Sequence, residues 1–343
     1  MFKWLFGRTT PQERLQAQRR SETLVSLAKG GIPVEAQERI RQELALGKDF
    51  FASDLTAREY LVTRQNGLDV IGQVMGSSFY HVRFGGLYQG RWRQTGELVD
   101  LSKAHLDSRT LAISRMKQEA ELLGASGVIG VKLKSNAHDW SNNLTEFTAV
   151  GTAVRIPGWS GETFTSALSA QEFWQLYQLG YLPTGVAMGV CSYYMYTDND
   201  TQNLLYSWWG GNNRNNAEVP LYTGGLQYAR ETAMDRLTSD IIAHNADGVV
   251  GMDVEVEMEH VEYESGNRRY HDLVAHFLAL GTSVRYEPRV AVPQPLSTLM
   301  CIDLTAKRKG RHGVTRLDQL AAGHTGETGS PEISAENAPT VSE

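Results

Sequence analysis

The chain has 343 residues, of which 41% are hydrophobic and 21% are charged, and its formal net charge is −6. This size and composition are typical of a globular protein with two or three domains. The negative charge excludes a nucleic-acid partner from our expectations, because phosphate binding requires a basic surface. The two cysteines, Cys191 and Cys301, are too few for a disulfide framework or a cysteine-rich zinc site. We therefore expect a cytoplasmic protein.

The N-terminus combines aromatic and basic side chains. No apolar run of the sequence approaches the roughly 18–20 residues of a membrane span. The segment Met1–Arg8 is also too short for a signal peptide. Trp4 beside Lys3 and Arg8 suits a membrane interface, and the alternative is a hydrophobic end that packs on the protein or frays. Besides the cytoplasmic location, a weak contact of residues 1–8 with a membrane surface therefore remains an alternative.

Two helices are predicted before the main body of the chain. Pro11 suits the first turn of a helix, and Gly30 and Gly31 end that helix. Residues 34–46 then show an amphipathic pattern that stops near Gly47. We expect a helical hairpin within an N-terminal segment of residues 1–49.

The sequence repeats itself from residue 51 onwards. Shifted by 113 residues, residues 51–80 lie over residues 164–193 with 11 identities in 30 positions, where average composition predicts about two. Larger shifts of 121 and 130 align Gly127 with Gly248 and Gly151 with Gly281. The growing shift places insertions in surface loops of the second copy. The chain therefore holds two diverged copies of one domain.

Each copy shows the same order of predicted elements: a strand, a loop, a helix, and two strands that form a hairpin. In the first copy the elements are a strand at 70–82, a helix around 113–123, and strands at 127–131 and 147–156; in the second they are a strand at 186–196, a helix around 234–241, and strands at 248–252 and 273–286. We predict an α+β fold with two tandem β-α-β-β two-layer domains.

The domains are expected at residues 50–157 and 162–288, joined by a Gly- and Pro-containing linker at 157–161. A C-terminal tail, residues 289–343, follows. Its composition from about residue 321 is typical of disorder.

Two motifs carry a family resemblance. A helix runs into Gly124-Ala-Ser-Gly-Val-Ile-Gly130, and a later strand contains Gly151-Thr-Ala-Val154; the second copy has Asn245-Ala-Asp-Gly-Val-Val-Gly251 and Gly281-Thr-Ser-Val284. Both copies resemble the YbjQ-like family, which is named as a heavy-metal-binding domain, and together they cover about two thirds of the chain. The resemblance implies dodecin-like antiparallel sheets and rings of five domains, so that the main partner is the chain itself. It carries no agreed catalytic residue.

An acidic hairpin in the second copy is the strongest chemical feature. Alternation along a strand places Glu255, Glu257 and Glu259 on one face, and His260 and Glu262 on the other.

If the hairpin turns near Gly266 and Asn267, His271 lies opposite Glu262. His260, Glu262 and His271 would then form a site for zinc or another divalent metal. The alternative is a solvated hairpin end, because a slip of one residue in the register separates the three side chains.

Other candidate residues have structural interpretations. Cys191 is expected to be a buried thiol on a strand, and His244 a histidine at a helix end. Trp208 and Trp209, beside an Asn-rich loop, suit either a planar ligand or a neighbouring subunit. Phosphate loops, nucleophile elbows and His-Glu-x-x-His helices are absent from the sequence.

Three functions remain in order of preference. The first is a non-enzymatic, ring-forming binding or scaffold protein, and the second is a divalent-metal-binding protein that uses the acidic hairpin. The third is an enzyme whose site lies between subunits, for which the sequence shows no set of nucleophile, base and orienting group.

Overall fold

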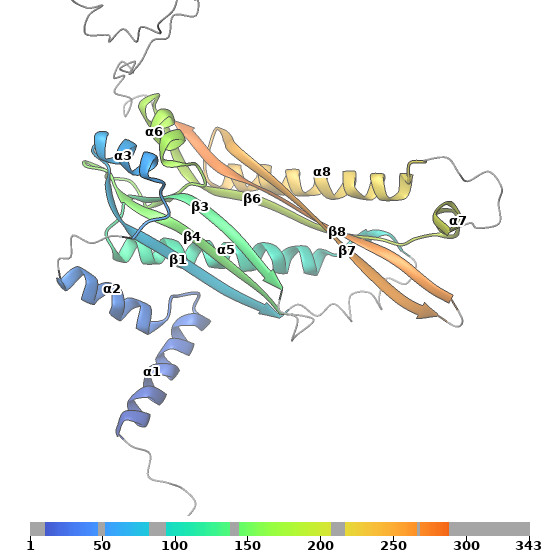
Figure 1. Ribbon diagram of the computed structural model, residues 1–343, viewed down its shortest axis with the longest axis horizontal. Coiled ribbons are helices and arrows are strands. Elements are labelled where there is room, and N and C mark those ends of the chain that lie inside the picture. Colours follow the sequence, from blue (N-terminus) through green and yellow to red (C-terminus); the bar gives the residue numbers. More distant parts are fainter. Residues whose placement is uncertain are drawn as a thin grey trace, which may run out of the picture. The chain divides into compact units, whose positions relative to one another are not determined.

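The computed structural model describes residues 11–46, 52–81, 94–137, 144–206, 217–265 and 268–287 (Figure 1). The chain divides into two compact units, residues 1–292 and 293–343, and every described residue belongs to the first. Several predicted features lie outside the described residues: the segment 1–8, the loop of Trp208 and Trp209, Cys301 and the tail from residue 289.

Two helices and two modules follow one another along the chain. The helices are α1 (Pro11–Ala28) and α2 (Val34–Leu46). The first module contains α3 (Ala57–Gln65), β1 (Asp69–His81), β2 (Gly96–Glu97), α5 (Val99–Leu122), β3 (Gly127–Ala137) and β4 (Leu144–Arg155). The second contains β5 (Phe164–Thr165), α6 (Ala170–Gln178), β6 (Tyr181–Met195), α7 (Asn199–Tyr206), α8 (Pro220–Ala243), β7 (Gly248–Ser265) and β8 (Arg268–Tyr286).

A short helix opens each module, which the predicted β-α-β-β order omitted. Thr56 accepts a hydrogen bond from the backbone of Glu59, whose carboxylate accepts one from the backbone of Thr56. Ser169 and Glu172 repeat this capping box at the start of α6. The Ser/Thr-x-x-Glu spacing is a known signal for a helix N-terminus, so both helices were readable in the sequence.

The two antiparallel-rich sheets exchange short strands. The first sheet has the order β1-β4-β3-β5 and the second the order β2-β6-β8-β7. Strand β5 belongs to the second module but pairs in parallel with β3. Strand β2 belongs to the first module but pairs with β6. Each module therefore completes the sheet of the other.

Helix α5 packs between the two sheets. It covers β1 and β4 of its own sheet and also contacts β6 of the second sheet, while α8 covers β6 and β8 (Figure 1). Ala112 and Met116 of α5 lie in one buried cluster with Val186 and Met188 of β6. We call the face of a sheet that its own helix covers the inner face, and the opposite face the outer face. The outer face of the second sheet thus receives α5.

The same two contacts join helix and strand in both modules. Glu119 of α5 accepts a hydrogen bond from the backbone of Met75 (3.1 Å), and Asp240 of α8 accepts one from Met188 (2.9 Å). Arg115 and Arg236 both donate to a strand carbonyl at 2.6 Å, in Ser77 and Val190 respectively.

Helix α2 flanks the first module. Ile40 of α2 is 1% exposed and belongs to the cluster around α5. Arg115 also donates to the carbonyl of Gly31 (3.1 Å), and Gln118 donates to that of Gly30 (3.2 Å). The turn between the two predicted helices is thereby fixed on α5.

No helix within the described ranges combines the length and apolar character that crossing a membrane requires.

Two glycines allow the helices to approach the sheets. A Cβ added to Gly189 would lie 1.9 Å from the carbonyl oxygen of Ala233, and one added to Gly76 would lie 2.1 Å from that of Ala112. Backbone atoms cannot move aside as a flexible side chain can. Glycine at these positions is therefore required for the helix to lie on its strand.

Replacing Gly189 by alanine should destabilise the protein. The added methyl group would force α8 away from β6, and overpacking of this kind costs about 1–3 kcal/mol. Thermal denaturation of Gly189→Ala should show a lower midpoint than the unaltered chain. The matched control is Gly224→Ala in α8, where an added Cβ meets nothing within 4 Å and alanine favours the helix. Equal midpoints for Gly189→Ala and Gly224→Ala would contradict the packing described above.

Candidate functional site

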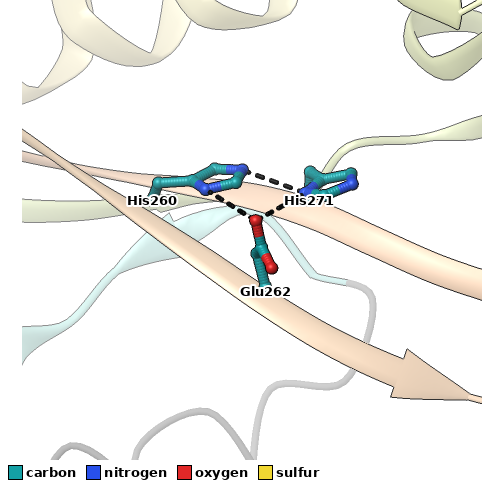
Figure 2. A group of neighbouring side chains, drawn as sticks. All are labelled: His260, Glu262 and His271. Atoms are coloured by element: carbon teal, nitrogen blue, oxygen red, sulfur yellow. Dashed lines mark hydrogen bonds and ion pairs between the residues drawn. The ribbon is translucent and has the colours of Figure 1, made fainter.

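The histidines and the glutamate predicted on the acidic hairpin come together near its end. Strands β7 and β8 pair antiparallel with Glu262 opposite His271 and His260 opposite Leu273. His260 and Glu262 are two residues apart on one strand, so their side chains share a face. Figure 2 shows the three side chains converging above the hairpin.

The distances within this group are short. His271 Nδ1 lies 3.1 Å from His260 Nε2 and 3.6 Å from Glu262 Oε1. His260 Nδ1 lies 3.5 Å from Glu262 Oε1, and the two imidazole rings stack with an interplanar angle of 7°. One ligand atom from each residue fits within 4.8 Å of the others (Figure 2).

This cluster belongs to an extension of the second module. Strands β7 and β8 have 18 and 19 residues, whereas β3 and β4 of the first module have 11 and 12. Glu262 and His260 are exposed, and His271 is half-buried. The described part of β3 carries Lys132 and Lys134, so this acidic and histidine-rich character belongs to the second hairpin.

The face of β7 that carries Glu255 and Glu257 turns toward helix α5. Arg109 of α5 is buried, which lowers its pKa to about 10, while the charges of Glu255 and Glu257 act in the opposite direction. The guanidinium also lies 4.5 Å from the ring centre of Phe147. Both glutamates are exposed and lie in the electrostatic field of this buried arginine from the other module.

A row of polar side chains crosses the contact between the modules, and no sequence pattern indicated it. Ser192 Oγ lies 2.9 Å from His276 Nδ1, and His276 Nε2 lies 3.4 Å from Glu259. The order hydroxyl, imidazole and carboxylate is that of a hydrolase triad. Ser192 is 0% exposed, however, and its backbone nitrogen donates to Ser102 of α5. The row therefore joins the modules and offers no accessible nucleophile.

His105 of α5 extends this buried row. Its ring stacks on His276 at 5.3 Å, and its Nδ1 lies 3.1 Å from Arg109. Among the described residues its Nε2 has no hydrogen-bond partner. Burial, followed by the charge of Arg109 and the proximity of His276, lowers the pKa of His105 to about 3. The imidazole is therefore neutral between the modules.

The remaining single candidates have structural positions. Cys191 lies on β6 with 0% exposure, and burial raises its pKa to about 12, so the thiol is inert. His244 is the C-cap residue of α8. Both agree with the structural interpretations of the sequence.

His244 also lines a cavity of about 590 Å³ between the linker and the second module. Trp159, Tyr177 and Arg285 line it as well, and Arg285 lies 3.8 Å from Glu287. Aromatic rings and charges of both signs do not select one class of ligand.

The buried His105 should make stability depend on pH. The unfolded chain takes up a proton at this residue below its ordinary pKa of about 6.5, whereas the folded chain keeps it neutral down to about pH 3. The free energy of unfolding should therefore fall as the pH decreases from 6.5 toward 3, by up to about 1.4 kcal/mol per pH unit from this residue.

The variant His105→Gln removes this contribution, so its urea midpoints should decline less steeply than those of the unaltered chain. His244→Gln provides the control and should keep the original slope. Identical slopes for His105→Gln and the unaltered chain would show that the buried imidazole does not destabilise the folded protein in acid.

Comparison with known proteins places the chain in a family. A family model described as "Putative heavy-metal-binding", of the YbjQ type, matches residues 62–157. The hairpin cluster of His260, Glu262 and His271 lies outside this match.

The "Encapsulin nanocompartment protein Rv1762c" of Mycobacterium tuberculosis is 34% identical over 251 residues, which span 71% of this chain and 89% of that protein. A UPF0145 protein of Pseudothermotoga lettingae is 30% identical over 91 residues, 26% of this chain and 84% of the relative. A UPF0145 protein of Halalkalibacterium halodurans is 41% identical over 61 residues, 18% of this chain and 56% of the relative. The chain belongs to the family of the Mycobacterium tuberculosis protein, and residues 62–157 form its YbjQ-type domain.

Proposed function

We propose that the chain is a non-enzymatic assembly protein made of two YbjQ-like domains, at residues 50–157 and 162–288. In this proposal it forms multimers by contacts between modules and serves as a component of an encapsulin-type nanocompartment. The relative from Mycobacterium tuberculosis, which carries that name, motivates the second part.

The assignment of a second domain rests on repeated local structure. Both modules have a β-bulge at the same place in the hairpin, between Ile129 and Lys132 and between Val250 and Asp253. A glycine with positive φ occupies each bulge, +64° at Gly130 and +59° at Gly251. These correspondences extend beyond the residues that the family model matches.

The observation that carries the assembly proposal is a difference between the two outer faces. Met188, on the outer face of the second sheet, is 3% exposed because α5 of the first module covers it. Met75 occupies the equivalent position on the first sheet and is 53% exposed. Phe79, on the same face, is 57% exposed. An exposed apolar face of this kind marks an interaction surface.

The second module has a complementary exposed surface. Met252, Val254, Val256 and Met258 of β7 are 42–48% exposed. The counterparts of Met252 and Val254 in the first module, Val131 and Leu133, pack in the cluster that joins the two modules.

A chain that pairs these surfaces with a second copy repeats its own internal contact. Such a contact is heterologous, and it closes a ring if the rotation between successive modules permits. The rings of five domains that the YbjQ resemblance implies are one solution of this kind.

A charge on the exposed face should weaken assembly. Met75→Asp should reduce self-association at least about tenfold, because burying a methionine side chain contributes about 1.5–3 kcal/mol and 1.4 kcal/mol corresponds to a factor of ten. Native mass spectrometry over a range of concentrations would measure this change. Leu24→Asp in α1, where the side chain is 67% exposed, is the control and should leave the multimer intact. A chain that is monomeric at micromolar concentration would refute the assembly function.

A second function is supported by the hairpin cluster: binding of a divalent metal such as zinc by His260, Glu262 and His271. Tetrahedral zinc has ligand atoms about 3.3 Å apart, since its bonds to nitrogen and oxygen are about 2.0–2.1 Å long. The observed separations of 3.1, 3.5 and 3.6 Å lie close to this value. A rotation of the His260 ring is needed, because its two nitrogens contact different partners. Three protein ligands would leave a fourth position for water.

Zinc binding should depend on both histidines. The unaltered chain, prepared without a tag, should bind about one zinc ion per chain in calorimetry and elemental analysis. His260→Ala and His271→Ala should each lose this stoichiometric binding, because each removes one of the three ligands. His244→Ala, which alters a histidine far from the hairpin in sequence, should bind as before. Equal zinc content in the unaltered chain and the double variant would remove the metal function.

A further inference from the structure

The segment that leads into the second module is attached on two sides. On one side, the backbone nitrogen of Ala167 donates to Thr282 of its own module at 2.9 Å. On the other side, the segment runs along β3 of the first module, with Phe164 opposite Gly127 and Thr165 opposite Val128.

Three backbone hydrogen bonds continue this pairing past β5. The Ser166 nitrogen donates to the Val128 carbonyl (2.8 Å), the Val131 nitrogen donates to the Ser166 carbonyl (2.9 Å), and the Gly130 nitrogen donates to the Leu168 carbonyl (2.9 Å). Thr165, Ser166 and Leu168 are consequently buried. The edge of β3 is thus covered by the other module.

The first module has the same lead-in segment, attached on one side only. The backbone nitrogen of Asp54 donates to Thr152 at 3.3 Å, which is the counterpart of the bond between Ala167 and Thr282. Residues 52–56 match residues 165–169 in sequence, and both segments end in a capping box. Ala52 and Asp54 are nevertheless exposed, whereas Thr165, the counterpart of Ala52, is buried.

The second module has the edge that this segment would fit. Strand β7 is the last strand of its sheet, and it carries the same bulge as β3. Residues 251–258 are all exposed. A Cβ on Gly127 would lie 2.4 Å from the Phe164 ring, whereas a Cβ on Gly248, its counterpart, would meet nothing within 4 Å. The space that Phe164 fills beside Gly127 of β3 is open beside Gly248 of β7.

We propose that residues 52–55 of one chain pair in parallel with residues 248–252 of a second chain, in the register that residues 165–168 adopt on residues 127–131. This inference rests on the proposed assembly function and names its contact. An unpaired strand edge with apolar side chains is a template for another chain. Here both the segment and the edge are supplied by the same protein, and the contact inside each chain sets the register.

Cysteine cross-linking tests this register. Val128 faces Thr165 within the chain, and the equivalent pair between chains is Val249 and Ala52. A chain with Cys301→Ser, Ala52→Cys and Val249→Cys should form disulfide-linked dimers and higher species on a non-reducing gel. Cys191 can remain, since it is buried and inert. Mixing a tagged chain that carries only Ala52→Cys with an untagged chain that carries only Val249→Cys should give a tagged heterodimer.

The matched control moves one cysteine along the strand. Ala52→Cys with Val254→Cys places the second thiol at an exposed position five residues further on, roughly 17 Å along the strand, and should form at least tenfold less cross-linked dimer. Native mass spectrometry could show multimers while the two cysteine pairs cross-link equally, or while neither pair cross-links. Either result would overturn the proposed register, and the assembly function would stand. A chain that stays monomeric in native mass spectrometry would overturn both the proposed register and the assembly function.

Discussion

The structure depends on one helix that packs against two sheets. Helix α5 lies on its own sheet through glycine-dependent backbone contact at Gly76, and its other side buries Val186 and Met188 of the next module. A helix with apolar residues on both sides cannot complete its packing inside one small domain. The second module therefore functions as part of the first module's core. The polar row through His105, His276 and Ser192 lies within this contact and keeps its register specific.

The same constraint relates to the exposed apolar surfaces of the two modules. Each module offers a sheet face, a strand edge and a helix to its neighbour, and only one of the two possible junctions is formed within the chain. Met75 of the first sheet and Met252 of the second are exposed, and in the proposed assembly a second chain covers them. In the proposed assembly, oligomerisation is a consequence of the duplication, since a second junction of the same kind would pair the two exposed surfaces. In such an assembly the tandem arrangement would halve the number of junctions that depend on protein concentration.

Sequence patterns predicted the secondary structure of the modules well and their connection poorly. The period of the apolar residues located α5 and α8, whereas the bulges at Gly130 and Gly251 were not predicted. The pairing of Glu262 with His271 also followed from alternation and the position of the turn. The exchanged strands β2 and β5 were missed, because each has two residues and depends on a partner distant in sequence. For the same reason, nothing in the local sequence of Ser192 indicated its contact with His276.

Hydrogen–deuterium exchange, followed as the protein concentration rises, tests the central claim most directly. The account predicts that peptides covering residues 73–79 and 248–258 gain protection together as multimers form. The peptide covering residues 186–192, whose face is buried within the chain, should be protected at every concentration. Exchange at residues 73–79 and 248–258 that stays fast and independent of concentration would contradict the claim that these two surfaces are halves of one contact.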